Sequence, residues 1–226
     1  MPLDVQPYLP ADGEAEAARG LSRMALGIVG SEILKIAGEV RAMQAEGRQI
    51  VNLTVGDFSP SEFRIPARLE EAIRQAYVEG QTNYPPSDGL PELRKAVAAF
   101  LEREQGLKFP IASILISGGA RPLLYGAYRA VLDPGDVVVY PVPSWNNNHY
   151  VHMSDAIGCP VVCSPDDAFL PTPERLLPHL HDARLLVLNS PLNPTGTAFE
   201  ADALKAITLG VVTENERRRS AGERAL

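Results

Sequence analysis

The sequence predicts an α/β fold in which a mainly parallel β-sheet is covered by helices on both faces. Short segments that are almost wholly apolar alternate with longer helix-like segments from about residue 113 onward. Strands that are apolar on both sides are typical of parallel sheets buried between two helical layers. A turn signal, Asp133-Pro134-Gly135-Asp136, separates two of these segments.

Composition narrows the class of protein. The 226 residues are 45% apolar and 22% charged, as in ordinary globular proteins, and the formal net charge is −7. An acidic chain without a basic block is a poor nucleic-acid binder, and we expect Arg217–Arg219 to be a solvated helix face. No apolar stretch approaches the roughly 18 residues of a membrane span, and the N-terminus lacks the order of a signal peptide. We expect a cytoplasmic protein.

The two cysteines, Cys159 and Cys163, are expected to be free thiols. A metal site usually needs three or four ligands, and no second cysteine pair is present. We therefore predict no metal site.

The first 112 residues are expected to be mainly helical. After a loosely ordered lead-in of about twenty residues, apolar positions recur at helical spacing, and proline or glycine marks the helix ends. The expected elements are a helix at 31–46, a short strand at 49–53, a helix from Pro66 to Gly80 and a helix from Pro91 to Gly106.

Strands and helices alternate in the remainder of the chain. The expected strands are 113–117, 137–141, 160–163 and 184–189, and the expected helices run to Leu132 and over 144–157, 173–180 and 202–221. Ligands of doubly wound sheets bind beyond the carboxyl ends of the strands. Three segments in such positions are therefore candidates for a binding site.

The first candidate segment is Gly118-Gly119-Ala120-Arg121. Small residues here let backbone N–H groups approach an anion at a helix N-terminus, where the helix dipole also favours negative charge. The segment matches neither the dinucleotide-binding pattern nor a P-loop. Taken alone, it is better explained as a tight turn between a strand and a helix.

The other two segments each present one side chain. Trp145 is the only tryptophan and follows a buried strand, so it could fill the core or stack on a flat aromatic ring. Asn193 lies between Pro191 and Pro194, which restrict its backbone to a narrow range. Its amide can then present a donor at a fixed place, although a plain asparagine turn gives the same pattern.

Together these motifs resemble the class I/II aminotransferases of fold type I, which depend on pyridoxal 5′-phosphate (PLP). The resemblance rests on five motifs in the family's order: NLTVGDF (52–58), YPPSDGLPELR (84–94), LDPGD (132–136), PSW (143–145) and NSPLNPTG (189–196). It implies a three-layer large domain with a parallel-dominated, incomplete sheet. Residues 1–60 would be an N-terminal arm and part of the small domain, and 61–226 part of the PLP-binding large domain.

The resemblance also implies roles for named residues. The backbone at Gly119, Ala120 and Arg121 would hold the cofactor phosphate. Trp145 would stack on the pyridine ring and adjoin the substrate. Asn193 would donate a hydrogen bond to the 3-oxygen of the ring and lie near the substrate carboxylate.

Two further residues would complete the site. Gly56 would lie against the substrate, and Tyr84 would reach the phosphate bound by the partner subunit of a homodimer. The substrates would be an amino acid and a 2-keto acid, with aspartate or aromatic amino acids as first choices. A PLP-dependent lyase or synthase of the same fold, and a non-catalytic PLP-fold binding module, remain open alternatives.

The family's Schiff-base lysine has no counterpart in the chain. In the family this lysine follows the NPTG motif, as do an aspartate at the ring nitrogen, a tyrosine and an arginine for the substrate. Residues 197–226 are instead expected to be one helix, and Lys35, Lys95, Lys108 and Lys205 match no family position. The lysine would hold the cofactor and move the proton. We therefore expect a truncated chain with no catalytic residue and no useful transamination alone.

Overall fold

The computed structural model describes residues 20–54, 56 and 58–226. The chain forms two compact units. We call residues 30–120 the helical unit, and residues 20–29 together with 121–226 the sheet unit. The predicted lead-in lies almost wholly outside the described residues. The family-based division into 1–60 and 61–226 remains a prediction.

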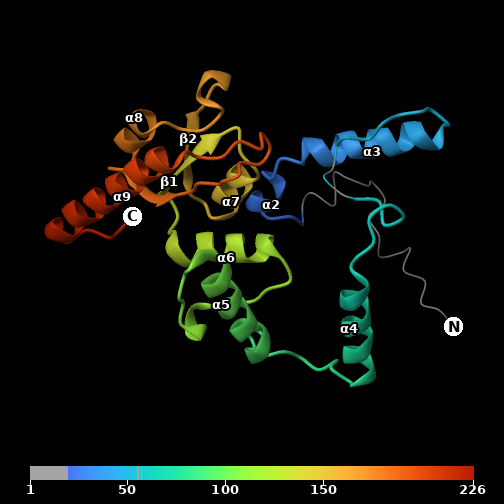
Figure 1. Ribbon diagram of the computed structural model, residues 1–226. Coiled ribbons are helices and arrows are strands. Elements are labelled where there is room, and N and C mark those ends of the chain that lie inside the picture. Colours follow the sequence, from blue (N-terminus) through green and yellow to red (C-terminus); the bar gives the residue numbers. More distant parts are fainter. Residues whose placement is uncertain (1–19, 55, 57) are drawn as a thin grey trace. The chain divides into compact units, whose positions relative to one another are not determined.

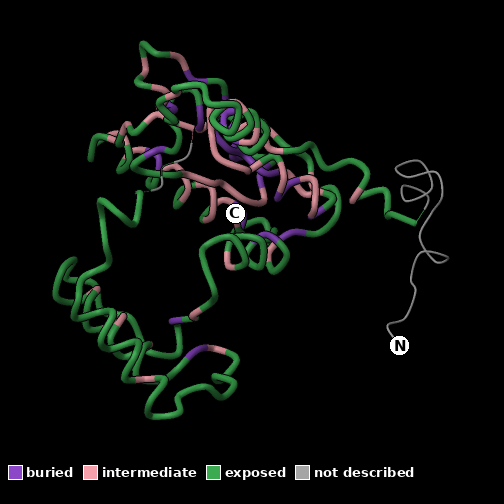
Figure 2. Tube along the Cα trace, turned by 90° about the vertical axis from the view of Figure 1, so that its right-hand side faces the viewer, coloured by how far each residue is buried: buried purple, intermediate pink, exposed green. Residues whose placement is uncertain are grey.

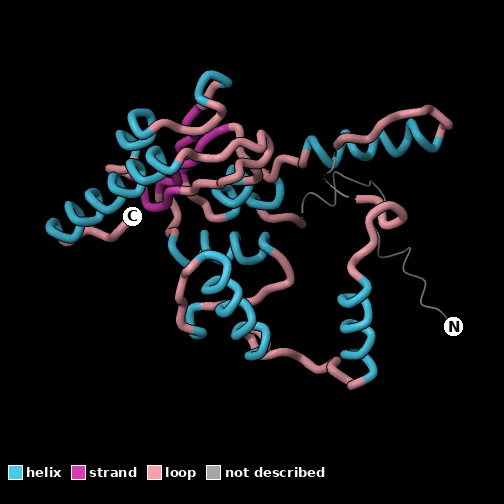
Figure 3. Tube along the Cα trace, viewed as in Figure 1, coloured by secondary structure: helices cyan, strands magenta, loops and turns pink. Residues whose placement is uncertain are grey.

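The helical unit contains the three helices that the sequence predicts (Figure 3). They are α3 (Glu32–Ala45), α4 (Ala67–Val78) and α5 (Pro91–Gln105), and a short 3₁₀ turn, η2 (Ile111–Ser113), follows. Ser31 accepts a hydrogen bond from the Leu34 N–H at the start of α3. Gly106, in the left-handed conformation with φ 68°, ends α5.

The two strands predicted for this unit, 49–53 and 113–117, are wrong, because neither segment is a strand. Both were expected from their apolar, branched residues. A strand also needs a hydrogen-bonded neighbour, and that neighbour is not encoded locally. Val51 and Leu53 are 84% and 89% exposed. Ile116 donates a backbone hydrogen bond to Asp88 O at 3.1 Å, which ties the segment to a loop and not to a strand.

The Tyr84–Arg94 segment owes its shape to a glycine and an arginine. Gly89 has φ +102°, and a Cβ there would lie 2.5 Å from the Cβ of Ile116, so a larger residue does not fit. The Arg94 guanidinium forms an ion pair with Asp88 and donates to Ile111 O at 2.7 Å. These contacts fasten the beginning of α5 to residues 111–116.

The sheet unit contains the predicted parallel sheet, with three strands in the order β2-β1-β3. Its strands are β1 (Val137–Val142), β2 (Ile157–Val162) and β3 (Ala183–Leu186). Its helices are α2 (Arg23–Leu26), α6 (Ala120–Val131), α7 (Asn147–Met153), α8 (Pro173–Leu176) and α9 (Ala201–Ala221), with 3₁₀ turns η3 (Pro165–Asp167) and η4 (Leu177–His179). The helix predicted over 144–157 is too long, because β2 already begins at Ile157.

Side chains of the central strand β1 pack on both faces of the sheet, as expected for a parallel sheet between helices. One cluster of buried residues contains Val138 and Tyr140 with Tyr128 of α6, Leu132 just after α6, and Tyr150 and Val151 of α7. The other contains Val139 with Val161, Ala183, Leu176 of α8 and Ile207 of α9. Figure 1 shows α7 beside the sheet and α8 and α9 on its other side. Most of the buried residues belong to the sheet unit (Figure 2).

Arg218 corrects the expectation that Arg217–Arg219 is a solvated face, because its side chain is only 7% exposed. Its Nε donates to Glu214 at 2.7 Å. One terminal nitrogen donates to three main-chain oxygens, those of Leu180 (2.7 Å), His181 (3.0 Å) and Ala183 (2.6 Å). A guanidinium can be buried when its donors find acceptors, and these acceptors lie just before β3 and at its first residue. Arg218 therefore fastens the end of α9 to the sheet.

The remaining sequence-based expectations concern thiols, metals and membranes. Both cysteines are free thiols, Cys163 buried and Cys159 half-buried. Among the described residues, no group of three or more histidine, cysteine, aspartate or glutamate side chains is arranged to hold a metal ion. None of the described helices has the length and apolarity needed to cross a membrane.

Candidate functional site

A cavity of about 320 Å³ lies in the sheet unit, beyond the carboxyl ends of β1 and β3. Its walls come from α6, the β1–α7 loop and the loop after β3. The lining residues are Leu124, Pro141, Ser144, Trp145, Asn147, Val187, Leu188, Asn189, Pro191, Leu192 and Asn193. Trp145 and Asn193, both predicted from sequence as site residues, thus lie on one cavity although 48 positions separate them along the chain.

Trp145 is positioned by the first residues of α7. Asn146 takes the left-handed conformation (φ 60°) just before this helix. The Tyr128 hydroxyl donates to Asn147 Oδ1 at 3.0 Å, which fastens the beginning of α7 to α6. Burial raises the pKa of Tyr128 far above its usual value, with smaller contributions from Tyr140 and Tyr150, so the hydroxyl keeps its proton and remains a donor.

Arg121 brings a positive charge to the tryptophan. Its guanidinium carbon lies 5.7 Å from the centroid of the Trp145 ring, which is a cation–π distance. Arg121 belongs to the first turn of α6. Both residues were predicted as cofactor contacts through the family resemblance, but their contact with each other was not predicted.

Gly119 and Ala120 directly precede Arg121 at the N-terminus of α6. Gly119 has φ +141°, a conformation that side-chain-bearing residues rarely adopt. The N–H groups of a helix's first turn lack acceptors within the helix and carry the positive end of its dipole. Gly119 and Ala120 are the last two residues of the helical unit, and Arg121 is the first residue of the segment that belongs to the sheet unit. Their contact with a phosphate remains a prediction.

The loop that contains Asn193 is held by hydrogen bonds within the loop. The Asn193 N–H donates to Asn189 Oδ1 at 2.9 Å, and the Leu192 N–H donates to Thr197 O at 2.7 Å. Leu192 is 2% exposed, so it packs the loop onto the unit. The burial of Leu192 was not predicted, although a large apolar residue between Pro191 and Asn193 was a signal that could have indicated it.

The Asn193 side chain remains available for a ligand. The residue is exposed, and its amide has no hydrogen-bond partner among the described residues. The cavity therefore combines an aromatic face, a cation beside it and a free amide. These groups suit a flat aromatic ring that carries an anionic substituent and an oxygen acceptor, which are features of PLP.

Tyr84 and Gly56 lie in the helical unit and are both exposed, Tyr84 fully so. Val55 and Asp57, the neighbours of Gly56, lie outside the described residues. The predicted contacts of Tyr84 with a partner's phosphate and of Gly56 with substrate remain predictions.

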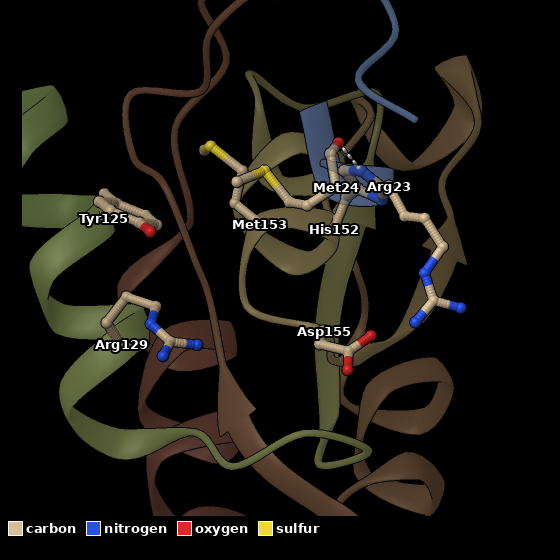
Figure 4. A pocket seen from close by; sticks show the side chains of 7 residues that line it. All are labelled: Arg23, Met24, Tyr125, Arg129, His152, Met153 and Asp155. Carbon is tan, nitrogen blue, oxygen red and sulfur yellow. Dashed lines mark hydrogen bonds between the residues drawn. The ribbon is translucent and has the colours of Figure 1, made fainter. Parts of the chain in front are cut away.

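A second and larger cavity, of about 720 Å³, opens toward the C-terminal ends of α6 and α7. It is lined by Arg23, Met24, Tyr125, Arg129, His152, Met153 and Asp155 (Figure 4). None of these residues was predicted as a site residue from the sequence. They share no short motif, because α2 is distant in sequence from α6 and α7.

Comparison with known proteins identifies the family. The family model described as aminotransferase class I and II matches residues 48–214. An aspartate aminotransferase from Rhizobium meliloti is 36% identical over 173 residues, covering 76% of this chain and 42% of that protein. An aspartate/prephenate aminotransferase from Thermus thermophilus is 32% identical over 191 residues, covering 84% and 49%.

A solved structure agrees with these matches. The aspartate aminotransferase from Thermus thermophilus with maleate superposes with a TM-score of 0.82 at 32% identity, covering 87% of this chain and 51% of that one. The chain therefore belongs to the class I and II aminotransferase family and has its PLP fold type I architecture, as the sequence motifs predicted. It spans about half the length of the relatives it matches.

Proposed function

We propose that this chain provides cofactor-positioning residues of a PLP-dependent aminotransferase that moves an amino group between an amino acid and a 2-keto acid. The observation that carries the proposal is the shared cavity of Trp145 and Asn193, with the Arg121 guanidinium 5.7 Å from the tryptophan ring. Aspartate is the first substrate to test, because the matched relatives include aspartate and aspartate/prephenate aminotransferases.

Each residue has a distinct proposed role toward the cofactor. Trp145 stacks on the pyridine ring, and the free amide of Asn193 donates to a ring oxygen and lies near the substrate carboxylate. Arg121 and the N–H groups at Gly119 and Ala120 hold the phosphate. PLP, when bound, supplies the electron sink for chemistry at the α-carbon, and these residues supply orientation.

Proton transfer needs a group that this cavity lacks. Of the described residues that line it, none is a lysine, a histidine or a carboxylate. General acid–base catalysis requires such a side chain within hydrogen-bond reach of the reacting atom. We therefore expect the chain to bind PLP non-covalently, with no transamination by these residues alone.

The same observation favours a second candidate, a non-catalytic PLP-binding module. Both candidate functions predict that the chain binds PLP. They differ in whether the protein to which these residues belong transfers amino groups. The family resemblance also implies a homodimer in which Tyr84 contacts the partner's phosphate. Sedimentation of the purified chain with and without PLP tests that part of the proposal.

Equilibrium dialysis against PLP tests the proposed site. Asn193→Ala and Arg121→Gln are each expected to weaken PLP binding about ten-fold, which corresponds to loss of one hydrogen bond to a charged group. Arg48→Gln, which removes an exposed arginine of the helical unit, serves as the matched control and is expected to change nothing. Equal PLP affinity in all three variants would reject this cavity as the cofactor site.

Keto-acid formation from aspartate and a 2-keto acid tests the chemistry. The purified chain with PLP is expected to react no faster than free PLP. Turnover clearly above that background would show that the chain contains a proton-transfer group and would contradict the assignment of binding alone.

A further inference from the structure

The two cysteines of the chain have different surroundings. Cys159 lies within β2 and is half-buried, whereas Cys163 directly follows the strand and is 6% exposed. The Cys163 thiol donates to Val161 O at 3.4 Å. Burial raises the pKa of this thiol, and the nearby Arg175 offsets that effect only in part. Cys163 therefore keeps its proton and is protected from reagents in solution.

A histidine lies beside the other thiol. Nδ1 of His179, the last residue of η4, is 3.5 Å from Cys159 Sγ, and the two residues are 20 positions apart in sequence. The His179 side chain is exposed. With Nδ1 unprotonated, the thiol donates to this nitrogen. An imidazole that accepts the proton leaves a thiolate, which is the nucleophilic form of cysteine. The pair is therefore a nucleophile beside a base.

The strand that carries Cys159 is open to solvent along one edge. Among the described strands β2 pairs only with β1, so it lies at one edge of the sheet. The neighbours of the cysteine, Gly158 and Pro160, are both exposed, and proline in a strand is typical of an edge. The Cys159 side chain packs partly against the buried cluster that contains Val139, which holds it in place. A small reagent can therefore reach a positioned thiol.

Cys163 is too distant to form a disulfide with Cys159. The backbone is extended between them, because β2 runs to Val162 and the Cys163 N–H continues the ladder by donating to Val142 O. Four residues of strand separate the two Cα atoms by about 13 Å, whereas a disulfide needs about 7 Å or less. The chain contains no other cysteine. A mixed disulfide formed at Cys159 therefore cannot be resolved by a second thiol of the same chain.

We propose that Cys159, with His179 as its base, is a modification site for small disulfides such as glutathione disulfide. The thiol proton passes to His179 Nδ1, and the thiolate sulfur attacks one sulfur of the reagent. A new S–S bond to Cys159 forms as the S–S bond of the reagent breaks, and the released thiolate takes the proton from His179. Cys159 is thereby oxidised to a mixed disulfide, and half of the reagent is reduced to a free thiol.

Mass spectrometry of the reduced, purified chain incubated with glutathione disulfide tests the proposal. One glutathionyl group per chain is expected, and Cys159 should react at least about ten-fold faster than Cys163. Cys159→Ser should lose this modification, and Cys163→Ala should keep it. In the chain unfolded in urea the two cysteines should react at similar rates, because the selectivity comes from the fold. Absence of modification, or equal rates at the two cysteines of the folded chain, would overturn the proposal.

A pair of histidine variants tests the role of His179. His179→Gln is expected to slow the modification of Cys159 about ten-fold and to make its rate rise more steeply between about pH 7 and 9, because the thiol then loses its proton only to solvent. His181→Gln is the matched control, since His181 is also exposed and lies two residues away, and it should react like the wild type. An unchanged rate in His179→Gln, or a slower rate with the wild-type pH dependence, would contradict the action of His179 as a base.

Cys159→Ser also separates this proposal from the proposed function. Neither Cys159 nor His179 lines the Trp145–Asn193 cavity, so this variant is expected to bind PLP with unchanged affinity. Conversely, Asn193→Ala should be modified by glutathione disulfide at the wild-type rate. A rate that falls as far in Asn193→Ala as in His179→Gln would contradict the assignment of the reaction to the Cys159–His179 pair.

Discussion

The helical unit and the sheet unit differ in how much apolar surface they bury. Neither α4 nor α5 contains a buried residue, and Leu69 of α4 is 49% exposed. In the sheet unit Val138, Val139 and Leu176 are completely buried. Helices form from local signals, whereas a core needs elements that cover one another. The sheet unit has both, and it is the unit that contains the Trp145–Asn193 cavity.

The largest effect is expected from Arg218→Ala. This change leaves Glu214 without its buried partner and three main-chain oxygens without their donor, and it should cost about 3–5 kcal/mol. Arg217→Ala, which removes two neighbouring but more exposed ion pairs, should cost much less than Arg218→Ala. Urea unfolding measures both values. Similar costs for the two variants would show that burial does not distinguish these arginines.

A pair of leucine variants compares the two units directly. Leu176→Ala removes a fully buried side chain in the sheet unit and is expected to cost about 2–5 kcal/mol. Leu69→Ala removes a half-exposed side chain in the helical unit and is expected to cost about 0.5 kcal/mol or less. The change in the free energy of unfolding provides the comparison. A larger loss of stability in Leu69→Ala than in Leu176→Ala would contradict the assignment of the main hydrophobic core to the sheet unit.

Glu214 makes the stability of the sheet unit dependent on pH. Hydrogen bonds from Arg217 and then Arg218 lower its pKa from 4.5 to about 2. Since the folded-state pKa lies below the ordinary value, this carboxylate contributes stability above about pH 4.5 that is lost as the pH falls toward 2. Unfolding measured from pH 6 to about pH 2 should show this loss, and Glu214→Gln should make the pH dependence shallower. An unchanged slope would contradict the assignment.

Tyr128→Phe is expected to have a smaller effect on stability than Arg218→Ala or Leu176→Ala. The change removes the hydrogen bond to Asn147 and should cost about 1 kcal/mol, because the Asn147 oxygen loses its donor. Tyr77→Phe is the control in the helical unit, where the ring is 71% exposed, and should cost close to nothing. Thermal unfolding compares them. If the two variants are equally stable, the Tyr128–Asn147 contact does not fix the beginning of α7.

Sequence predicted those features whose signals are local. Pro66, Pro91, Gly106 and Gly222 mark helix ends through their own backbone preferences, and the corresponding helices α4, α5 and α9 are present. The strand predicted at 113–117 failed because strand pairing depends on a distant partner. Its apolar residues alone could not reveal that Ile116 bonds to Asp88 O.

The candidate site also contains residues that were predicted from the sequence and contacts that were not. Trp145 and Asn193 were candidates because each follows a predicted strand of a parallel sheet, and their cofactor roles were implied by the family resemblance of the motifs that contain them. The contact of Arg121 with Trp145 and the burial of Arg218 were not predicted. Both depend on which side chains from distant segments meet, and neither charged residue differs in local pattern from an exposed arginine.

Trp145 fluorescence during a PLP titration tests the central claim most directly, because the chain contains a single tryptophan. If PLP stacks on Trp145 in the sheet unit, its emission should be quenched in a saturable manner, and Asn193→Ala should shift the midpoint to about ten-fold higher PLP. Quenching that rises linearly with PLP and is the same in Asn193→Ala would contradict the assignment of this cavity as the cofactor site.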